Sequence, residues 1–233
     1  MQLFSAEATP LLTGLIAYLL YFAFLRSTRV KTKITKLFTP LKSSFYWIQL
    51  TRVIAFVCMV ILPVTYIHFM NIEFWSVICK WTLTDTKYTL TLALILIPLG
   101  AFNAKGKEHL AMYPQVRMSQ WNTLEYLSNI ASWGLYLLGY EFLFRGILFL
   151  GLIPFTGLYP AIAINTILYA AAHLYKGKKE TLGSIPLGIL LCMITAETNT
   201  IWTAFAVHWI MAGNNFVWSH YYGKKINKLS SKN

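Results

Sequence analysis

Apolar residues in this chain gather into seven runs, which short polar or basic stretches separate from one another. A helix needs about 20 predominantly apolar residues to cross the hydrocarbon layer of a bilayer. The pattern therefore predicts an all-α transmembrane bundle of about seven helices, although the third and sixth runs are short and leave re-entrant segments open. The predicted helices cover residues 7–25, 46–70, 88–104, 128–153, 158–175, 181–195 and 200–222.

Lysine and arginine residues follow the first, third, fifth and seventh runs. With seven crossings all four clusters fall on one side of the membrane, and the positive-inside rule assigns that side to the cytoplasm. We therefore expect the N-terminus outside and the C-terminus in the cytoplasm. Arg52 lies near the inner end of the second run, where its long side chain is expected to reach the interface. The clusters comprise Arg26, Arg29, Lys31, Lys33, Lys36 and Lys42; Lys105, Lys107 and Arg117; Lys176, Lys178 and Lys179; and Lys224, Lys225, Lys228 and Lys232.

The composition also indicates a multi-pass protein of the cell membrane. Of the 233 residues, 57% are hydrophobic and only 12% are charged, and the mean hydropathy is +0.54, whereas about a quarter of the residues of a soluble domain are charged. The net charge of +12 lies in loops and tails, which favours topology and anionic headgroups and gives no reason to expect nucleic acid as a partner. Cys58, Cys79 and Cys192 are isolated, so we expect neither a disulfide nor a cysteine metal site.

A carboxylate and a guanidinium interrupt the fourth run, in the string Gly-Tyr-Glu-Phe-Leu-Phe-Arg-Gly that covers residues 139–146. A charge at that depth costs about 3 kcal/mol or more, so it normally marks a functional site. Glu141 and Arg145 are four residues apart and are able to pair on one face of a helix, which removes much of that cost. A purely structural staple between helices is the alternative interpretation.

Two histidines lie in later apolar runs, His173 in the fifth and His208 in the seventh. One glutamate and two histidines on neighbouring helices are able to hold and deprotonate a water molecule, which is the chemistry of a hydrolase. Asn165, Tyr169 and His173 recur every four residues and share one helical face, a stripe that equally suits helix packing. Glu141, His173 and His208 would also suit zinc, but three scattered ligands without a His-Glu-x-x-His motif are a weak metal signal.

Three strings in the C-terminal half carry a resemblance to a known family. They are Glu141-Phe-Leu-Phe-Arg145-Gly146, then Tyr169-Ala-Ala-Ala-His173-Leu, then Asn199-Thr-Ile-Trp202 leading to His208. In this order they resemble the motifs of the CPBP intramembrane proteases, the CAAX-processing and bacteriocin-processing (Abi) family. The resemblance covers about residues 140–215. It implies N-terminal membrane helices in 1–127, a catalytic core in 128–223 and a basic cytoplasmic tail in 224–233, with a site inside the bilayer that opens toward the cytoplasm.

Two positions depart from the family's pattern. Members usually carry two adjacent glutamates before the arginine and an Asn or Asp four residues after the second histidine, whereas this chain has Tyr140 and Ala212 there. In the family, the first glutamate and first histidine are thought to activate water, and the second histidine and the Asn support the oxyanion. Either Glu141 has taken over as the base, or the chain is inactive. Tyr140 is able to donate a hydrogen bond to an oxyanion, and Asn215, on the same face as His208, is able to replace the Asn in part.

The resemblance implies an intramembrane endopeptidase that hydrolyses a peptide bond with activated water. In the expected mechanism Glu141 activates the water, His173 orients it and His208 stabilises the oxyanion, while Arg145 holds Glu141 and Tyr169 supports the site. The expected partners are a peptide or membrane-protein substrate and the lipid bilayer. The resemblance requires no cofactor, although the residues would accept zinc. The sequence indicates no oligomeric state. The alternatives are an inactive member that binds a hydrophobic partner segment in immunity or regulation, and a transporter or channel, which the lack of an internal repeat disfavours.

Overall fold

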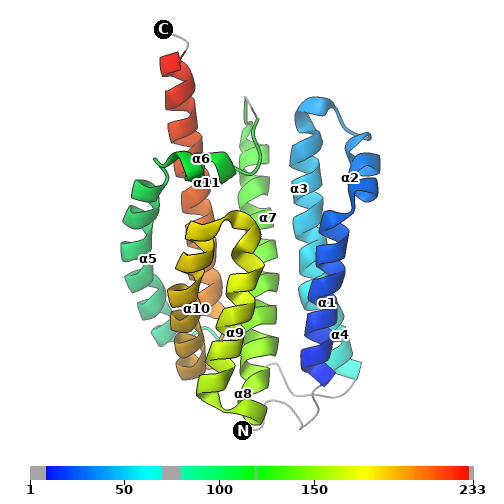
Figure 1. Ribbon diagram of the computed structural model, residues 1–233, viewed down its shortest axis with the longest axis vertical. Helices are drawn as coiled ribbons and strands as arrows, with labels where there is room; N and C mark the ends of the chain where they lie inside the picture. Colours follow the sequence, from blue (N-terminus) through cyan, green and yellow to red (C-terminus); the bar gives the residue numbers. More distant parts are fainter. Residues whose placement is uncertain (1–8, 70–79, 119, 231–233) are drawn as a thin grey trace.

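The protein is an all-helical bundle in the computed structural model, which describes residues 9–69, 80–118 and 120–230 (Figure 1). Within these residues the chain forms seven long helical rods, two short helices and no strand, so the predicted fold class is confirmed. The short helices are α2 (Thr28–Thr35) and α6 (Lys107–Met112). The rods are α1 (Thr9–Arg26); α3 (Pro40–Phe56), the π-helical turn η1 (Val57–Ile61) and α4 (Leu62–Phe69); α5 (Leu83–Asn103); α7 (Thr123–Glu141), the π-helix η3 (Phe142–Leu150) and α8 (Gly151–Thr156); α9 (Leu158–His173) with the 3₁₀ turn η4 (Leu174–Lys176); α10 (Lys178–Thr198); and α11 (Trp202–Ser230).

Four helical stretches of the described chain are long and apolar enough to cross a membrane, and α1 with α2 forms a fifth candidate that is bent by 58°. Helices α5 and α10, predicted as short runs, have 21 residues each, or about 31 Å at 1.5 Å per residue. That length crosses the hydrocarbon layer without a re-entrant turn. The protein is therefore a multi-pass membrane protein. The start of the first predicted run, Cys79 and Lys232 lie outside the described residues.

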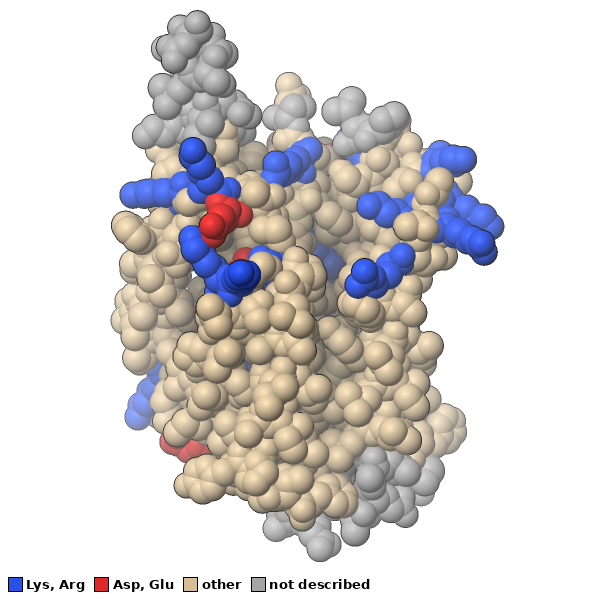
Figure 2. Space-filling model, viewed as in Figure 1, with Lys and Arg blue, Asp and Glu red and all other residues tan. Residues whose placement is uncertain are grey.

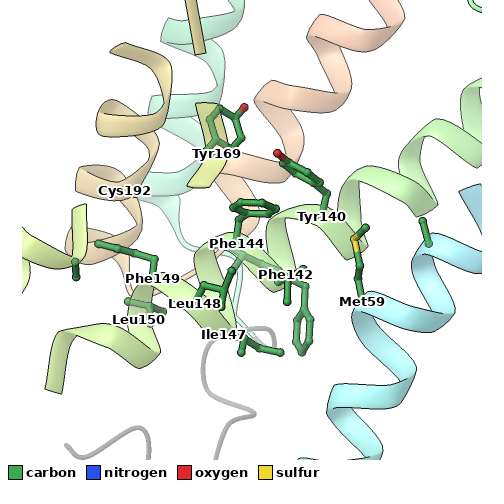
Figure 3. Close-up of a cluster of buried hydrophobic side chains, with 14 of the residues drawn as sticks. Met59, Tyr140, Phe142, Phe144, Ile147, Leu148, Phe149, Leu150, Tyr169 and Cys192 are labelled. Carbon is green, nitrogen blue, oxygen red and sulfur yellow. The ribbon is translucent and has the colours of Figure 1, made fainter. Parts of the chain in front are cut away.

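The π-helix η3 lies at the centre of the bundle, and all nine of its residues are buried. It contacts α1, α9, α10 and η1. Its sequence explains this position, because apart from Arg145 its larger side chains are apolar on every face, and such a helix is stable only when it is surrounded. Figure 3 shows Phe144 and Ile147 in one apolar cluster with Met59 of η1 and Tyr169 of α9. The segment that carries the sequence motif is thus held away from water on all sides.

Basic side chains gather at one end of the bundle, the end that carries α2, α6 and the turn between α9 and α10 (Figure 2). The flank of the bundle in the same view shows almost no charged residues, as contact with lipid tails requires. We refer to this end as the basic end. Which side of the membrane it faces stays a prediction from the positive-inside rule.

The side chain of Arg52 does not reach the interface, so this prediction from the sequence is wrong. Arg52 is only 4% exposed and turns toward α7, where its Nη1 donates to Asn129 Oδ1 at 2.9 Å and to Ser132 Oγ at 2.8 Å. Its guanidinium also lies 4.1 Å from the ring centroid of Trp133. Hydrogen bonds to polar acceptors on the neighbouring helix offset the free-energy cost of burying the guanidinium. Arg52 therefore links α3 to α7.

At the other end of the bundle, a buried carboxylate links two helices through hydrogen bonds. Asp85 lies in the first turn of α5 and is fully buried. Its Oδ2 accepts hydrogen bonds from the backbone and hydroxyl of Thr82, while its Oδ1 accepts from Thr200 at 2.7 Å and from Thr203 at 2.9 Å. The same side chain therefore caps α5 and ties it to the start of α11, the helix that carries His208.

We predict that Asp85→Ala lowers the free energy of unfolding by about 2–3 kcal/mol, because three threonine hydroxyls lose a charged acceptor in a buried place. The measurement is equilibrium unfolding in detergent. Lys87→Ala is the control, since Lys87 is exposed on the same helix. An unfolding midpoint for Asp85→Ala equal to that of the control would show that this clamp does not stabilise the fold.

Candidate active site

Glu141 stands where α7 passes into η3, and its side chain is fully buried between a cation and an imidazole. Its Oε2 lies 3.5 Å from Arg145 Nε, and its Oε1 accepts a hydrogen bond from His208 Nδ1 at 2.6 Å. The predicted pairing with Arg145 therefore forms. The carboxylate also accepts a hydrogen bond from a histidine 67 residues further along the chain. Glu141, Arg145 and His208 constitute the charged centre of the site.

Arg145 is held by groups from α9 as well as by the carboxylate. Its Nη1 donates to Asn165 Oδ1 at 2.8 Å, and its guanidinium lies 4.4 Å from the ring centroid of Tyr169. Asn165 in turn donates through Nδ2 to the backbone carbonyl of Phe144 at 2.7 Å, inside the π-helix. A π-helical segment alters the backbone pairing of a helix and often lies at functional sites. Here the side chain of Asn165 satisfies one of its carbonyls and positions Arg145 in the same contact.

The two histidines present defined tautomers, because each Nδ1 faces an acceptor. His173 Nδ1 lies 2.8 Å from the carbonyl oxygen of Tyr169, and His208 Nδ1 faces the Glu141 carboxylate. A carbonyl or carboxylate oxygen only accepts, so Nδ1 is the donor in both rings, and the protein leaves Nε2 without a partner in these contacts. The rings are nearly parallel, with centroids 6.2 Å apart and planes inclined by 24°.

Tyr140 lies beside both imidazoles. Its ring centroid is 5.7 Å from that of His208 and 6.2 Å from that of His173, with the planes nearly perpendicular. Its hydroxyl is buried and has no hydrogen-bond partner among the described residues. Figure 3 shows this hydroxyl pointing toward Tyr169, whose ring stands 5.8 Å away. The residue that replaces the family's first glutamate thus brings an uncommitted donor next to the histidines.

A cavity of about 280 Å³ adjoins the histidine pair and reaches toward the basic end. Tyr169, His173 and His208 line it, whereas Glu141 and Tyr140 are absent from its described lining. Among the residues predicted from the sequence, Asn215 also lines the cavity, and so does Ala212 at the place of the family's Asn. The lining also includes residues that the sequence did not connect with the site, among them His109, Tyr113, Trp133, Lys176 and Glu180.

The arrangement of Glu141, His173 and His208 does not fit a metal ion. No group of three or more His, Cys, Asp or Glu side chains in the described chain could hold a metal. The reason is visible in the contacts, since His208 Nδ1 and Glu141 Oε1 bond to each other and His173 Nδ1 is bonded to a backbone carbonyl. We therefore derive no catalytic step through zinc.

We predict strong coupling between Glu141 and Arg145 in a double-mutant cycle. Glu141→Leu or Arg145→Met alone should lower stability by about 3–5 kcal/mol, because each leaves an uncompensated buried charge, while the double variant should lose much less than the sum. Equilibrium unfolding in detergent measures all four proteins. The Lys179–Glu108 pair, 2.8 Å apart and mostly exposed, is the matched control and should show little coupling. Additive losses at Glu141 and Arg145 would contradict the pairing.

Comparison with known proteins agrees with the motifs. Residues 123–213 match the model of the family described as type II CAAX prenyl endopeptidase Rce1-like. The match begins at the first residue of α7 and ends in α11, so it includes Glu141, Arg145, His173 and His208 but not Asn215. No curated protein and no solved structure matches the chain. The match is consistent with the resemblance to the CPBP intramembrane proteases, and residues 123–213 are similar to the Rce1-like, or CAAX prenyl endopeptidase, family.

Proposed function

We propose that the protein is an intramembrane endopeptidase that hydrolyses a peptide bond at the histidine pair. The observation that carries this proposal is the 2.6 Å hydrogen bond between Glu141 and His208 beside a cavity that His208 also lines. Peptides with a prenylated CAAX end are the first substrate class to examine, because the matching family is described as a CAAX prenyl endopeptidase. The cavity leads to the basic end, which we place in the cytoplasm by the positive-inside rule.

Glu141 acts in this proposal through His208. The carboxylate is fully buried and is engaged by His208 and Arg145, whereas both histidines line the cavity and have only Nδ1 engaged by the protein. A carboxylate bonded to Nδ1 holds the imidazole in the tautomer that accepts a proton at Nε2, and it stabilises the imidazolium that results. Glu141 itself would deprotonate water poorly, because a carboxylate paired with a guanidinium is a weak base. An imidazole base supported by Glu141 avoids this difficulty.

The remaining roles follow from the hydrogen-bond character of each group. His173 carries its proton on Nδ1, so its Nε2 accepts a hydrogen bond and orients the attacking water. A neutral His173 has no proton at Nε2 for an oxyanion, and the donor must come from elsewhere. We assign this role to the Tyr140 hydroxyl, which has no partner among the described residues and whose ring lies beside both histidines, while Asn215 offers an amide donor in the cavity wall.

The proton follows one route through the reaction. His208 Nε2 takes a proton from the water as its oxygen attacks the carbonyl carbon, and the carbonyl oxygen becomes the oxyanion that Tyr140 stabilises. The same proton then passes from His208 to the leaving nitrogen as the carbon–nitrogen bond breaks. The products are a new carboxyl end and a new amine, and Glu141 and Arg145 keep their charges throughout.

The second candidate function is an inactive family member that binds a hydrophobic segment of a partner. The observation that favours it is the replacement of two family residues, by Tyr140 and by Ala212, which lie at the site rather than at its margin. Such a protein would keep the Glu141–Arg145–His208 centre for stability alone.

We predict that purified wild-type protein cleaves members of a quenched-peptide set that includes prenylated and unprenylated CAAX ends. Glu141→Gln, His208→Ala and His173→Ala should each lower kcat/KM by about 100-fold or more, because each removes a member of the acid–base machinery. A chelator should have no effect. His68→Ala is the control, since His68 is exposed on α4.

Two results would redirect the assignment. Loss of turnover with chelator would bring a metal into the mechanism. Absence of any turnover by folded wild-type protein that still binds a membrane partner would favour the inactive reading.

We predict a smaller loss for Tyr140→Phe, about 10-fold to 100-fold in kcat with KM little changed, as removal of one oxyanion donor requires. Tyr136→Phe, one turn earlier on the same helix, should retain activity. A loss in Tyr140→Phe as large as that in His208→Ala would instead give Tyr140 the role of base. Full activity in Tyr140→Phe would remove it from the mechanism.

A further inference from the structure

The first helix brings the chain to the basic end of the bundle, where it gives way to the short helix α2. Helix α1 has 18 residues, which span about 27 Å, close to the thickness of the hydrocarbon layer. Several of its leucines, among them Leu12, Leu19 and Leu20, are exposed, which suits contact with lipid tails. The axis bends by 58° between the two helices. Helix α2 therefore begins at about the depth of the lipid headgroups.

Ser27 separates the two helices and caps the second one. Its backbone is extended, with φ −71° and ψ 99°, and its hydroxyl accepts a hydrogen bond from the Val30 amide at 3.4 Å. Helix α2 packs against α3 on the side of the bundle away from α5 (Figure 1). None of its residues is buried. The bend at Ser27 thus exposes a short helix at the edge of the basic end.

Apolar, basic and hydroxyl side chains occupy separate faces of α2 and of the turn that follows it. Residues spaced by four and three positions share a helical face. The apolar face consists of Val30, Ile34 and Leu37. The cations that flank this face are Arg29, Lys33 and Lys36 on one side and Lys31 on the other. The threonines of α2 lie on the opposite face, so the pattern is typical of a helix at a membrane interface.

The cations of α2 have no acidic partner, unlike several other basic residues at the same end. Residues 26–41 contain no Asp or Glu, and the four cations are exposed and form no ion pair within the described chain. By contrast, Lys42, Lys176 and Lys179 each lie within 4 Å of a glutamate. Figure 2 shows acidic atoms among the basic ones over α6 and α10, but only basic ones over α2. The positive charge of α2 is therefore left for an external anion.

Leu37 carries the apolar face beyond the end of α2. Its amide donates to the carbonyl of Ile34, which continues the turn. The next residue, Phe38, stacks on Tyr46 of α3 with ring centroids 4.3 Å apart, so this turn is held against the bundle. Leu37 nevertheless stays 78% exposed. A leucine so placed gains free energy when it leaves water for an apolar layer.

We propose that α2 is a docking element for anionic phospholipids. Its four cations, Arg29, Lys31, Lys33 and Lys36, pair with phosphate headgroups, and Leu37 enters the upper part of the tails. The cytoplasmic leaflet carries anionic lipids, and the positive-inside rule places the basic end on that side. A lipid suits the surface better than a soluble anion, because the apolar tip lies beside the cations. This surface lies outside the matched residues 123–213, and the proposal does not depend on hydrolysis.

Retention of lipid by the purified protein tests the proposal. Full-length protein in dodecyl maltoside is mixed with equal amounts of phosphatidylglycerol and phosphatidylcholine of the same chains, repurified, and its retained lipids are counted by mass spectrometry. The wild type should retain at least about tenfold more phosphatidylglycerol, since each basic residue near an anionic surface strengthens binding about fivefold. Arg29→Gln, Lys31→Gln, Lys33→Gln and Lys36→Gln combined should bring the ratio to within about twofold of one. A wild-type ratio near one, or a high ratio that the combined variant keeps, overturns the proposal.

A matched variant separates the position of the charge from its amount. Lys105→Gln, Lys107→Gln, Lys178→Gln and Lys179→Gln combined remove the same charge from the same end, and these residues are exposed as well. This variant should keep the wild-type ratio. An equal loss in both variants would assign the preference to net charge alone and refute a docking element at α2. Thermal unfolding in the same detergent shows that each variant is folded.

Two further conditions separate a lipid from a soluble phosphate compound. At 1 M salt the Debye length falls to about 3 Å, from about 10 Å at 0.1 M, so the preference for phosphatidylglycerol should fall with it. Glycerophosphoglycerol, the headgroup without tails, should leave the retained lipid unchanged even in excess. A preference that survives 1 M salt would contradict the electrostatic pairing, and displacement of the lipid by its bare headgroup would refute docking to the membrane.

Discussion

The buried contact between Glu141 and Arg145 constrains most of what surrounds it. Neither charge is tolerable at the centre of an apolar bundle unless the other is present. Asn165 and the ring of Tyr169 hold the guanidinium, and His208 holds the carboxylate. Because these groups come from α9 and α11, the cost of burying one ion pair fixes how three helices are arranged. The same arrangement places two imidazoles side by side next to a cavity.

The exchange of a glutamate for Tyr140 changes the electrostatics of the site in a definite direction. Two adjacent carboxylates at this depth would repel each other and compete for Arg145 and His208. With a phenol in the first place, the single carboxylate keeps both partners, and the aromatic ring packs on Phe144 with centroids 4.3 Å apart. The change therefore suits stability. In the mechanism that we propose, the base is accordingly an imidazole backed by a carboxylate.

The sequence predicted the helices and the charged centre for the same physical reason, the high cost of polar groups in hydrocarbon. Hydropathy located the rods, and the cost of Glu141 and Arg145 marked the site before any contact was known. The sequence did not reveal the direction in which Arg52 points. A helix that is apolar on all faces has no periodic pattern that shows which face turns toward its neighbours. The sequence also did not reveal His109 and Lys176 in the cavity wall, since α6 folds back over α10 through tertiary contacts such as Tyr113 with Glu180.

The cavity joins two chemically different places, and the bilayer explains their order. Glu141 and Arg145 are fully buried because their pairing and the surrounding apolar side chains need the absence of water. Lys176 keeps 12% of its side chain exposed and Glu180 keeps 29%, which suits a place near the membrane surface. The cavity therefore runs from a charged, partly exposed end, where Lys176 and Glu180 lie, to the two histidines.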